Sequence, residues 1–248
     1  MRESPARRAD TITLSRRFCG PTESGNGGYT CGRLAAGLAG PVEVTLRRPP
    51  PLDRELTVLH TPDGLVLLDG TDTVAEARST GLSLEPPPCP GLGAATEAAA
   101  RYHGHQEHAF PKCFVCGPQR APGDGLRIFA GDVDDSPGLV ASPWKPGGEL
   151  AGNNGILRSE FVWAALDCPG AWAWLGELER PLVLGRLAVA IDAPVHAGQL
   201  HIVGGWRTGR EGRKYFSGTV IWRADGTVCA RGQATWIEID PARFAAAG

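Results

Sequence analysis

The sequence contains the same order of elements twice, a helix followed by a series of short antiparallel strands. Residues 25–78 hold a glycine turn, a helix pattern rich in small residues and several strand patterns. Residues 159–238 repeat the helix and the strands. Each half has a closing hairpin at an Asp-Gly turn, Asp63-Gly64 in the first and Asp225-Gly226 in the second. The similarity is one of pattern, and it predicts two similar modules whose sites form where they meet.

This duplication predicts an α+β fold in which two modules, each a helix wrapped by an antiparallel sheet, form a pseudo-dimer. We expect the first module over residues 11–80, a proline-rich linker over residues 81–112 and the second module over residues 113–240. The helices near residues 29–38 and 159–168 should lie side by side, with the two sheets joined edge to edge.

Composition argues against several classes of partner. The formal net charge of −2 gives no reason to expect nucleic acid or a membrane surface as a partner. No apolar run approaches the roughly 18 residues of a transmembrane helix, and the N-terminus lacks the apolar stretch of a secretory signal. We therefore expect a cytoplasmic protein whose seven cysteines are reduced thiols.

Three stretches of sequence carry a family resemblance. Asn26-Gly27-Gly28-Tyr29 is similar to the His/Asn-Gly-Gly-aromatic turn that begins the hotdog helix. Cys113-Phe114-Val115-Cys116-Gly117-Pro118, followed by a strand that we expect at residues 126–130, resembles the opening of small thioesterases of the phenylacetate-pathway type. The two Asp-Gly hairpins match the last hairpin of that fold. The chain therefore resembles a double-hotdog acyl-CoA thioesterase over nearly its whole length.

The resemblance implies a hydrolase that acts on an acyl-CoA-type thioester at the interface of the two modules. The implied partner is that small molecule, with no cofactor, and a homodimer is compatible with it. Because one fold hosts many chemistries, a non-catalytic protein that binds acyl-CoA or a lipid-like ligand is the alternative. A hydratase would need an Asp/His pair at a suitable spacing, and an α/β-hydrolase would need a Gly-x-Ser-x-Gly elbow; the sequence shows neither.

The glycine turn is a candidate oxyanion site. A helix N-terminus presents free N–H groups and a partial positive charge, and glycines let a thioester carbonyl approach those donors. Gly27 and Gly28 are the candidate donors, and Asn26 and Tyr29 complete the candidate substrate-binding turn. Asn26 stands where many members of the resembling family have histidine. A tight turn before a helix, without a catalytic role, is the simpler alternative.

Asp167 is the main candidate for the catalytic carboxylate. In single-module enzymes of the family that this chain resembles, an acid lies nine residues beyond the His/Asn position. Counting back nine residues from Asp167 leads to Arg158, and counting forward nine from Asn26 leads to Ala35. The first module thus has the glycines without the acid, and the second has the acid without the glycines. We expect one complete site, with Asp167 as general base or nucleophile facing the glycine turn.

Glu160 is the second candidate for the carboxylate. Its spacing of eight residues from Gly152 occurs in some members of the resembling family. A glutamate in the first turn of a helix is also favoured by the helix dipole alone. Arg158 could pair with Glu160 or contact a phosphate of a coenzyme A-type ligand, although a solvated surface arginine is the simpler interpretation.

Cysteines and histidines cluster at the start of the second module. Cys113 and Cys116 follow His103, His105 and His108, and these are ligand types and spacings that zinc accepts. A single Cys-x-x-Cys is a weak signal, and the same cysteines belong to the thioesterase-like opening. We expect no stoichiometric zinc, with the two cysteines as partly buried thiols at the entry into the second module.

Overall fold

The computed structural model describes residues 10–175 and 180–240. The first half contains β1 (Asp10–Thr13), the 3-10 turn η1 (Arg16–Phe18), α1 (Gly27–Ala35), β2 (Val42–Leu46), β3 (Glu55–Thr61), β4 (Gly64–Asp69) and β5 (Asp72–Ser79). Residues 49–51 are all proline, which cannot donate to a sheet ladder, and they separate β2 from β3.

The second half repeats this order on a larger scale. It contains β6 (Gly131–Asp132), β7 (Leu139–Trp144), the 3-10 turn η3 (Gly148–Leu150), α3 (Ser159–Ala165), α4 (Pro169–Trp172), β8 (Leu182–Ile191), β9 (His201–Glu211), β10 (Lys214–Arg223) and β11 (Val228–Glu238). The expected Asp225-Gly226 turn joins β10 to β11. The Asp225 carboxylate accepts the Thr227 N–H at 2.9 Å, and Gly226 adopts a φ of 87° that favours glycine.

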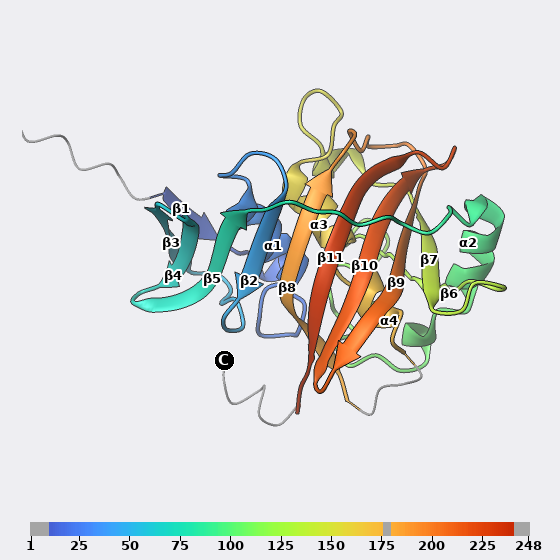
Figure 1. The fold of residues 1–248 in the computed structure, drawn as a ribbon, viewed down its shortest axis with the longest axis horizontal. Coiled ribbons are helices and arrows are strands. Elements are labelled where there is room, and N and C mark those ends of the chain that lie inside the picture. Colours follow the sequence, from blue (N-terminus) through green and yellow to red (C-terminus); the bar gives the residue numbers. More distant parts are fainter. Residues whose placement is uncertain (1–9, 176–179, 241–248) are drawn as a thin grey trace, which may run out of the picture.

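Within the described residues, the strands of both halves form one antiparallel 11-stranded sheet. Its order is β1-β3-β4-β5-β2-β8-β11-β10-β9-β7-β6 (Figure 1). The halves join where β2 pairs with β8, in a register that places Val42 opposite Val189 and Thr45 opposite Arg186. The expectation that the two sheets join edge to edge is confirmed.

The two central helices, α1 and α3, pack against each other, as expected. Two glycines of α1 allow this close contact. A Cβ on Gly28 would lie 2.7 Å from the carbonyl oxygen of Trp163, and a Cβ on Gly32 would lie 2.6 Å from the Cα of Glu160. The core that surrounds the helices includes the fully buried side chains of Leu34, Val44, Leu67, Leu166 and Leu187.

The segment between the halves contains a helix of its own, α2 (Gly91–Ala100), and the 3-10 turn η2 (His103–His105). Residues 80–90 are extended and cross β8, β11 and β10 in Figure 1, where Arg231 donates to the Leu84 carbonyl at 2.8 Å. Ala95 and Ala98 of α2 are buried against the second half of the sheet, in one cluster with Leu139. This segment therefore packs as part of the folded body.

The strand expected at residues 126–130 is wrong. These residues belong to no strand, Arg127 has a left-handed φ of 52°, and β6 begins only at Gly131. Their backbone instead bonds the cysteine segment: the Leu126 N–H donates to the Phe114 carbonyl at 2.8 Å, and the Ile128 N–H donates to the Val115 carbonyl at 2.9 Å. The alternating apolar side chains predicted a strand, but the segment has an irregular backbone that bonds a loop.

None of the helices in the described part of the chain has the length and apolar character that crossing a membrane requires.

Candidate functional site

The site is built on the N-terminus of α1. Asn26 is the N-cap of this helix, and its Oδ1 accepts the Tyr29 N–H at 2.8 Å. This capping bond orients the amide so that Nδ2 points away from the helix, toward Asp167. Because Asn26 is only 2% exposed, the amide is held by buried partners on both sides.

Asp167 approaches this N-terminus from the end of α3. Its Oδ2 accepts two hydrogen bonds, one from Asn26 Nδ2 at 2.7 Å and one from the Gly28 N–H at 2.9 Å. The carboxyl group is 2% exposed, and its Oδ1 has no hydrogen-bond partner within the described residues. A buried carboxyl oxygen without a partner costs free energy of folding, and a bound water or ligand that donates to it would offset this cost.

Burial shifts the proton affinity of this carboxyl group. Desolvation raises the pKa of Asp167 to about 7, against the hydrogen bonds from Gly28 and Asn26, which lower it; the nearby Cys113 raises it further. A carboxyl group with a pKa in this range can exchange protons near neutral pH, as a general base must.

A cavity of about 810 Å³ opens beside this carboxyl group, where the two halves meet. Its wall includes Asn26 and Gly27 from the first half, and Asp167, Trp172 and Trp236 from the second. The volume is within the range of about 300–1,000 Å³ that is usual for small-molecule sites. Apolar and aromatic walls with a few converging polar groups are typical of such sites.

The two glycines of the turn differ in what their N–H groups do. The Gly28 N–H is occupied by Asp167. The Gly27 N–H, at the first position of α1, has no hydrogen-bond partner among the described residues, and Gly27 lines the cavity. Gly27 is therefore the donor that the turn can offer to a ligand.

Three arginines also line the cavity: Arg47, Arg48 and Arg180. Arg47 pairs with Glu76 at 2.5 Å and Arg48 pairs with Asp72 at 2.5 Å, so two of these charges are already balanced. Arg180 is exposed and makes no ion pair or hydrogen bond with any residue that the structure describes. It is the cation most available to an anionic ligand.

Tyr29 does not line the cavity. Its ring stacks on Phe18 with centroids 4.1 Å apart and also contacts Phe114 and Phe161. Its hydroxyl accepts from Arg33 at 3.3 Å. The Tyr29 ring therefore contributes to packing around α1 and does not join Asn26 and Gly27 in the cavity wall.

Arg158 and Glu160 lie at the other end of the helix pair, at the start of α3. Arg158 Nε pairs with Glu160 Oε1 at 3.1 Å, and the Arg158 guanidinium lies 4.8 Å from the centroid of the Phe161 ring. Among the described residues that line the cavity, neither is present. The structure thus shows the Arg158–Glu160 pair that was considered as one alternative, and of the two candidate carboxylates Asp167 is the one that lines the cavity.

Only part of the expected cluster of cysteines and histidines comes together in the structure. Cys113 and Cys116 are buried and are joined by Cys168, which follows Asp167; the three Sγ atoms all lie within 4.8 Å of one another. Of the three histidines, only His108 reaches the cluster, with Nε2 3.3 Å from the Cys116 Sγ. The Nε2 atom of His103 instead lies 3.6 Å from the Oδ2 atom of Asp132.

The three thiols affect one another. Hydrogen bonds from the Cys116 and Cys168 thiols hold the pKa of Cys113 well below its usual value. Burial raises the pKa of Cys116, and the hydrogen bond that Cys168 donates to Cys113 raises the pKa of Cys168. Cys113 is therefore the sulfur that most readily carries the negative charge.

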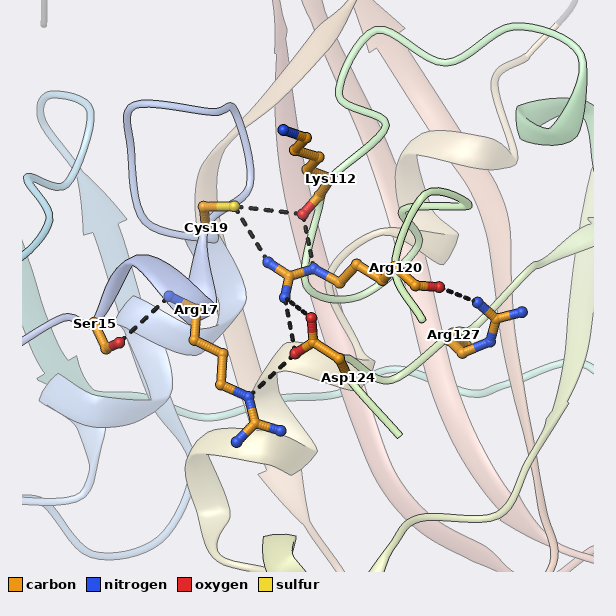
Figure 2. Close-up of polar contacts among 7 residues, drawn as sticks. All are labelled: Ser15, Arg17, Cys19, Lys112, Arg120, Asp124 and Arg127. Carbon is orange, nitrogen blue, oxygen red and sulfur yellow. Dashed lines mark hydrogen bonds and ion pairs between the residues drawn. The ribbon is translucent and has the colours of Figure 1, made fainter. Parts of the chain in front are cut away.

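A half-buried arginine, Arg120, fixes the loop that carries Cys113 against the first half. Figure 2 shows the Arg120 guanidinium between three partners: the Lys112 carbonyl at 2.8 Å, the Cys19 Sγ at 3.3 Å and the Asp124 carboxylate at 3.1 Å. Arg17 adds a second contact to Asp124 at 3.3 Å. The segment after Lys112 is thus tied to the strand-to-helix connection that leads into α1.

Solved structures resemble this one over almost the whole chain. A conserved protein of unknown function with a hot dog fold from Alicyclobacillus acidocaldarius aligns with a TM-score of 0.62, 12% identity and 96% coverage of both chains. The tesB protein of Mycobacterium avium subspecies paratuberculosis aligns with a TM-score of 0.60, 11% identity, and coverage of 93% of this chain and 92% of that one. A candidate thioesterase from Novosphingobium aromaticivorans aligns with a TM-score of 0.57, 14% identity, and coverage of 96% and 100%.

The chain has a double-hotdog fold. Two of these solved structures align across both halves, so the expected pseudo-dimer is the architecture of the whole chain. No protein-family model and no curated protein matches the sequence. At these identities the double-hotdog likeness establishes the fold, and the chemistry has to be argued from the site.

Two residues of the cavity wall that matter chemically, Cys168 and Arg180, were not predicted from the sequence. Cys168 lies 55 positions from Cys113, and no spacing rule connects the two. Arg180 lies in the connection between α3 and β8, where no periodic pattern indicates which side chains face inward. Only the pairing of the two halves brings these residues to one wall.

Proposed function

We propose that this protein hydrolyses an acyl-CoA-type thioester in the cavity between its two hotdog halves. One observation carries the proposal. The carboxyl group of Asp167, from one half, is hydrogen-bonded to the helix N-terminus of the other half and lines a cavity large enough for an acyl group. The fold neighbours named as a tesB protein and as a candidate thioesterase are consistent with this reading.

In the proposed reaction, the thioester carbonyl oxygen accepts the Gly27 N–H at the positive end of α1. A water molecule hydrogen-bonded to Asp167 attacks the carbonyl carbon, and its proton passes to the carboxylate. The C–S bond then breaks, the thiolate leaves and takes up a proton, and the acid is released. Asp167 as a nucleophile is the second version of this step, and it predicts an acyl-enzyme anhydride that a burst of product would reveal.

The cavity also supports the proposed class of substrate. Trp172 and Trp236 offer broad apolar surface for an acyl or aryl group. At the same cavity, the exposed Arg180 is available to a phosphate group of a coenzyme A moiety. The proposal thus assigns to Arg180 the phosphate contact that was first considered for Arg158.

The test is turnover of short, long and aromatic acyl-CoA thioesters by the purified full chain. Release of both coenzyme A and the free acid should be followed by chromatography, because the seven cysteines would react with thiol reagents. We expect hydrolysis of at least one acyl class, with the matching oxygen ester as a control for unselective esterase activity. Absence of turnover with every class would overturn the proposal.

A non-catalytic binder is the second candidate, and one observation favours it. Asp167 occupies the Gly28 N–H, so the turn offers a ligand one free donor where two were expected. Saturable binding of an acyl-CoA, measured by calorimetry without release of acid over hours, would assign the cavity to binding alone.

A further inference from the structure

Three cysteine sulfurs converge in the wall of the cavity. The Sγ atoms of Cys113, Cys116 and Cys168 lie within 4.8 Å of one another, and those of Cys113 and Cys168 are 3.7 Å apart. Two sulfur ligands at about 2.3 Å from one tetrahedral ion are themselves about 3.8 Å apart. Buried cysteines commonly pack as small apolar residues, but packing alone gives no reason for three sulfurs to meet at this separation.

Two of these sulfurs are carried by one tight turn. The Gly117 N–H donates to the Cys113 carbonyl at 2.9 Å, which closes the Cys-x-x-Cys-Gly turn. Asn26 Nδ2 lies 3.8 Å from the Cys113 sulfur and donates to it. Donors around a ligand sulfur stabilise its negative charge and fix its direction toward a metal.

His108 stands beside the cluster, but its ring is oriented for another contact. Its Nε2 is 3.3 Å from the Cys116 Sγ, close to the separation of about 3.5 Å between nitrogen and sulfur ligands of one tetrahedral ion. Its Nδ1, however, accepts the Phe110 N–H at 2.9 Å, which leaves the ring proton on Nε2. Ligation by His108 would require this arrangement to change, so the three sulfurs carry the inference.

We propose that Cys113, Cys116 and Cys168 bind a zinc ion that ties the Cys113 loop to the end of α3. Sets of three thiolates favour zinc over magnesium, calcium or manganese. Because Cys168 directly follows Asp167, the ion would hold the end of α3 that carries this carboxylate against the loop that carries Cys113 and Cys116. This reverses the expectation of no stoichiometric zinc, which rested on two cysteines without the third. The proposal does not depend on the proposed hydrolase activity.

The test measures metal in the full chain purified with reductant, without chelator and without a metal-affinity resin. We expect about one zinc ion per chain, and Co²⁺ added to the chelator-treated protein should give the absorption bands of tetrahedral thiolate coordination. Wild-type protein that contains almost no zinc and gives no such bands would overturn the proposal. So would a Cys113–Cys168 disulfide found by mass spectrometry in place of the metal.

Variants then assign the ligands. Cys168→Ser should weaken zinc affinity by more than the about 10–100-fold that follows loss of a group hydrogen-bonded to a ligand. Cys229→Ser is the matched control, because Cys229 is a buried cysteine on β11 outside the cluster, and it should keep full metal content. Equal zinc content in the two variants would contradict the assignment. If Cys168→Ser fails to fold, the cobalt spectrum of the wild type still decides.

Discussion

The two central helices begin in equivalent places but with different chemistry. At the start of α1, Asn26 caps the helix with its side chain and is followed by two glycines. At the start of α3, the N-cap is Arg158, whose side chain makes no capping bond within the described part of the chain. When the two N-caps are aligned in sequence, Ala35 stands at the position that corresponds to Asp167. Only the first helix N-terminus therefore faces a carboxylate from this position.

The packing of the same two helices is much more symmetric than their chemistry. A Cβ on Gly28 would lie 3.1 Å from the Cα of Ala164, and a Cβ on Gly32 would lie 2.6 Å from the Cα of Glu160. Both ends of the helix pair therefore approach closely, as the shared sheet demands. We infer that the double-hotdog fold requires the close approach at both ends, whereas the proposed chemistry requires polar groups at one end.

The largest expected effect comes from removing the Asp167 carboxylate, which distinguishes the two helix N-termini. Asp167→Asn should lower kcat/KM for the hydrolysed acyl-CoA by about 100- to 10,000-fold, the usual scale for loss of an acid–base group. The fold should survive, because an asparagine Oδ1 can accept the bonds that Asn26 and Gly28 now donate to the carboxylate. Steady-state kinetics with the substrate identified in the panel measure the change.

Glu160→Gln is the matched control for this prediction. Glu160 sits at the opposite end of the helix pair, in an ion pair with Arg158. Its loss should change kcat/KM by less than about threefold, because an ion pair of this kind contributes about 0–1 kcal/mol. If Glu160→Gln were the more damaging change, the catalytic role would move to the start of α3.

The next prediction uses the two glycines of the helix contact. Gly28→Ala and Gly32→Ala should each destabilise the fold by about 1–3 kcal/mol, because each new methyl group would meet backbone or Cβ atoms at 2.6–2.7 Å. Only Gly28→Ala also displaces the Asp167 carboxylate, and a shift of about 1 Å at a reacting group costs about 100-fold in rate. Urea unfolding and kcat/KM, measured on both variants, separate the two effects. Equal losses of rate would mean that the helix contact, and not the Asp167 position, controls turnover.

The sequence could predict the parts of this site that depend on local pattern. The start of α1 follows from its turn and capping residues. The count of nine residues back from Asp167 led to Arg158, the position in the second half that corresponds to Asn26, and the structure places the Asp167 Oδ2 2.9 Å from the Gly28 nitrogen. The consequence of that contact was not predictable. Whether an N–H is free or occupied depends on side-chain geometry, which no spacing specifies.

Contacts that depend on tertiary pairing could not be predicted. Leu126 and Ile128 alternate as a strand does, but their N–H groups bond the cysteine segment because that segment lies beside them in the fold. Cys168 joins Cys113 for the same kind of reason, through the packing of α3 against α1. A single sequence shows which side chains are suited to a sheet or a metal, but it does not show which distant segment completes the set.

The last prediction compares the contributions of the two N-caps to stability. Asn26→Ala should destabilise the protein by about 1–3 kcal/mol, because it removes a helix cap worth about 0.5–2 kcal/mol and a buried bond to Asp167. Arg158→Ala should cost less than about 1 kcal/mol, since its side chain is 47% exposed and contributes a surface ion pair and no cap. Asn26→Ser sharpens the test: serine keeps the cap but cannot reach Asp167 with an amide, so it should recover part of the stability and little of the activity. Chemical denaturation measures all three, and similar losses for the alanine variants would show that the two helix N-termini are equivalent in stability despite their different residues.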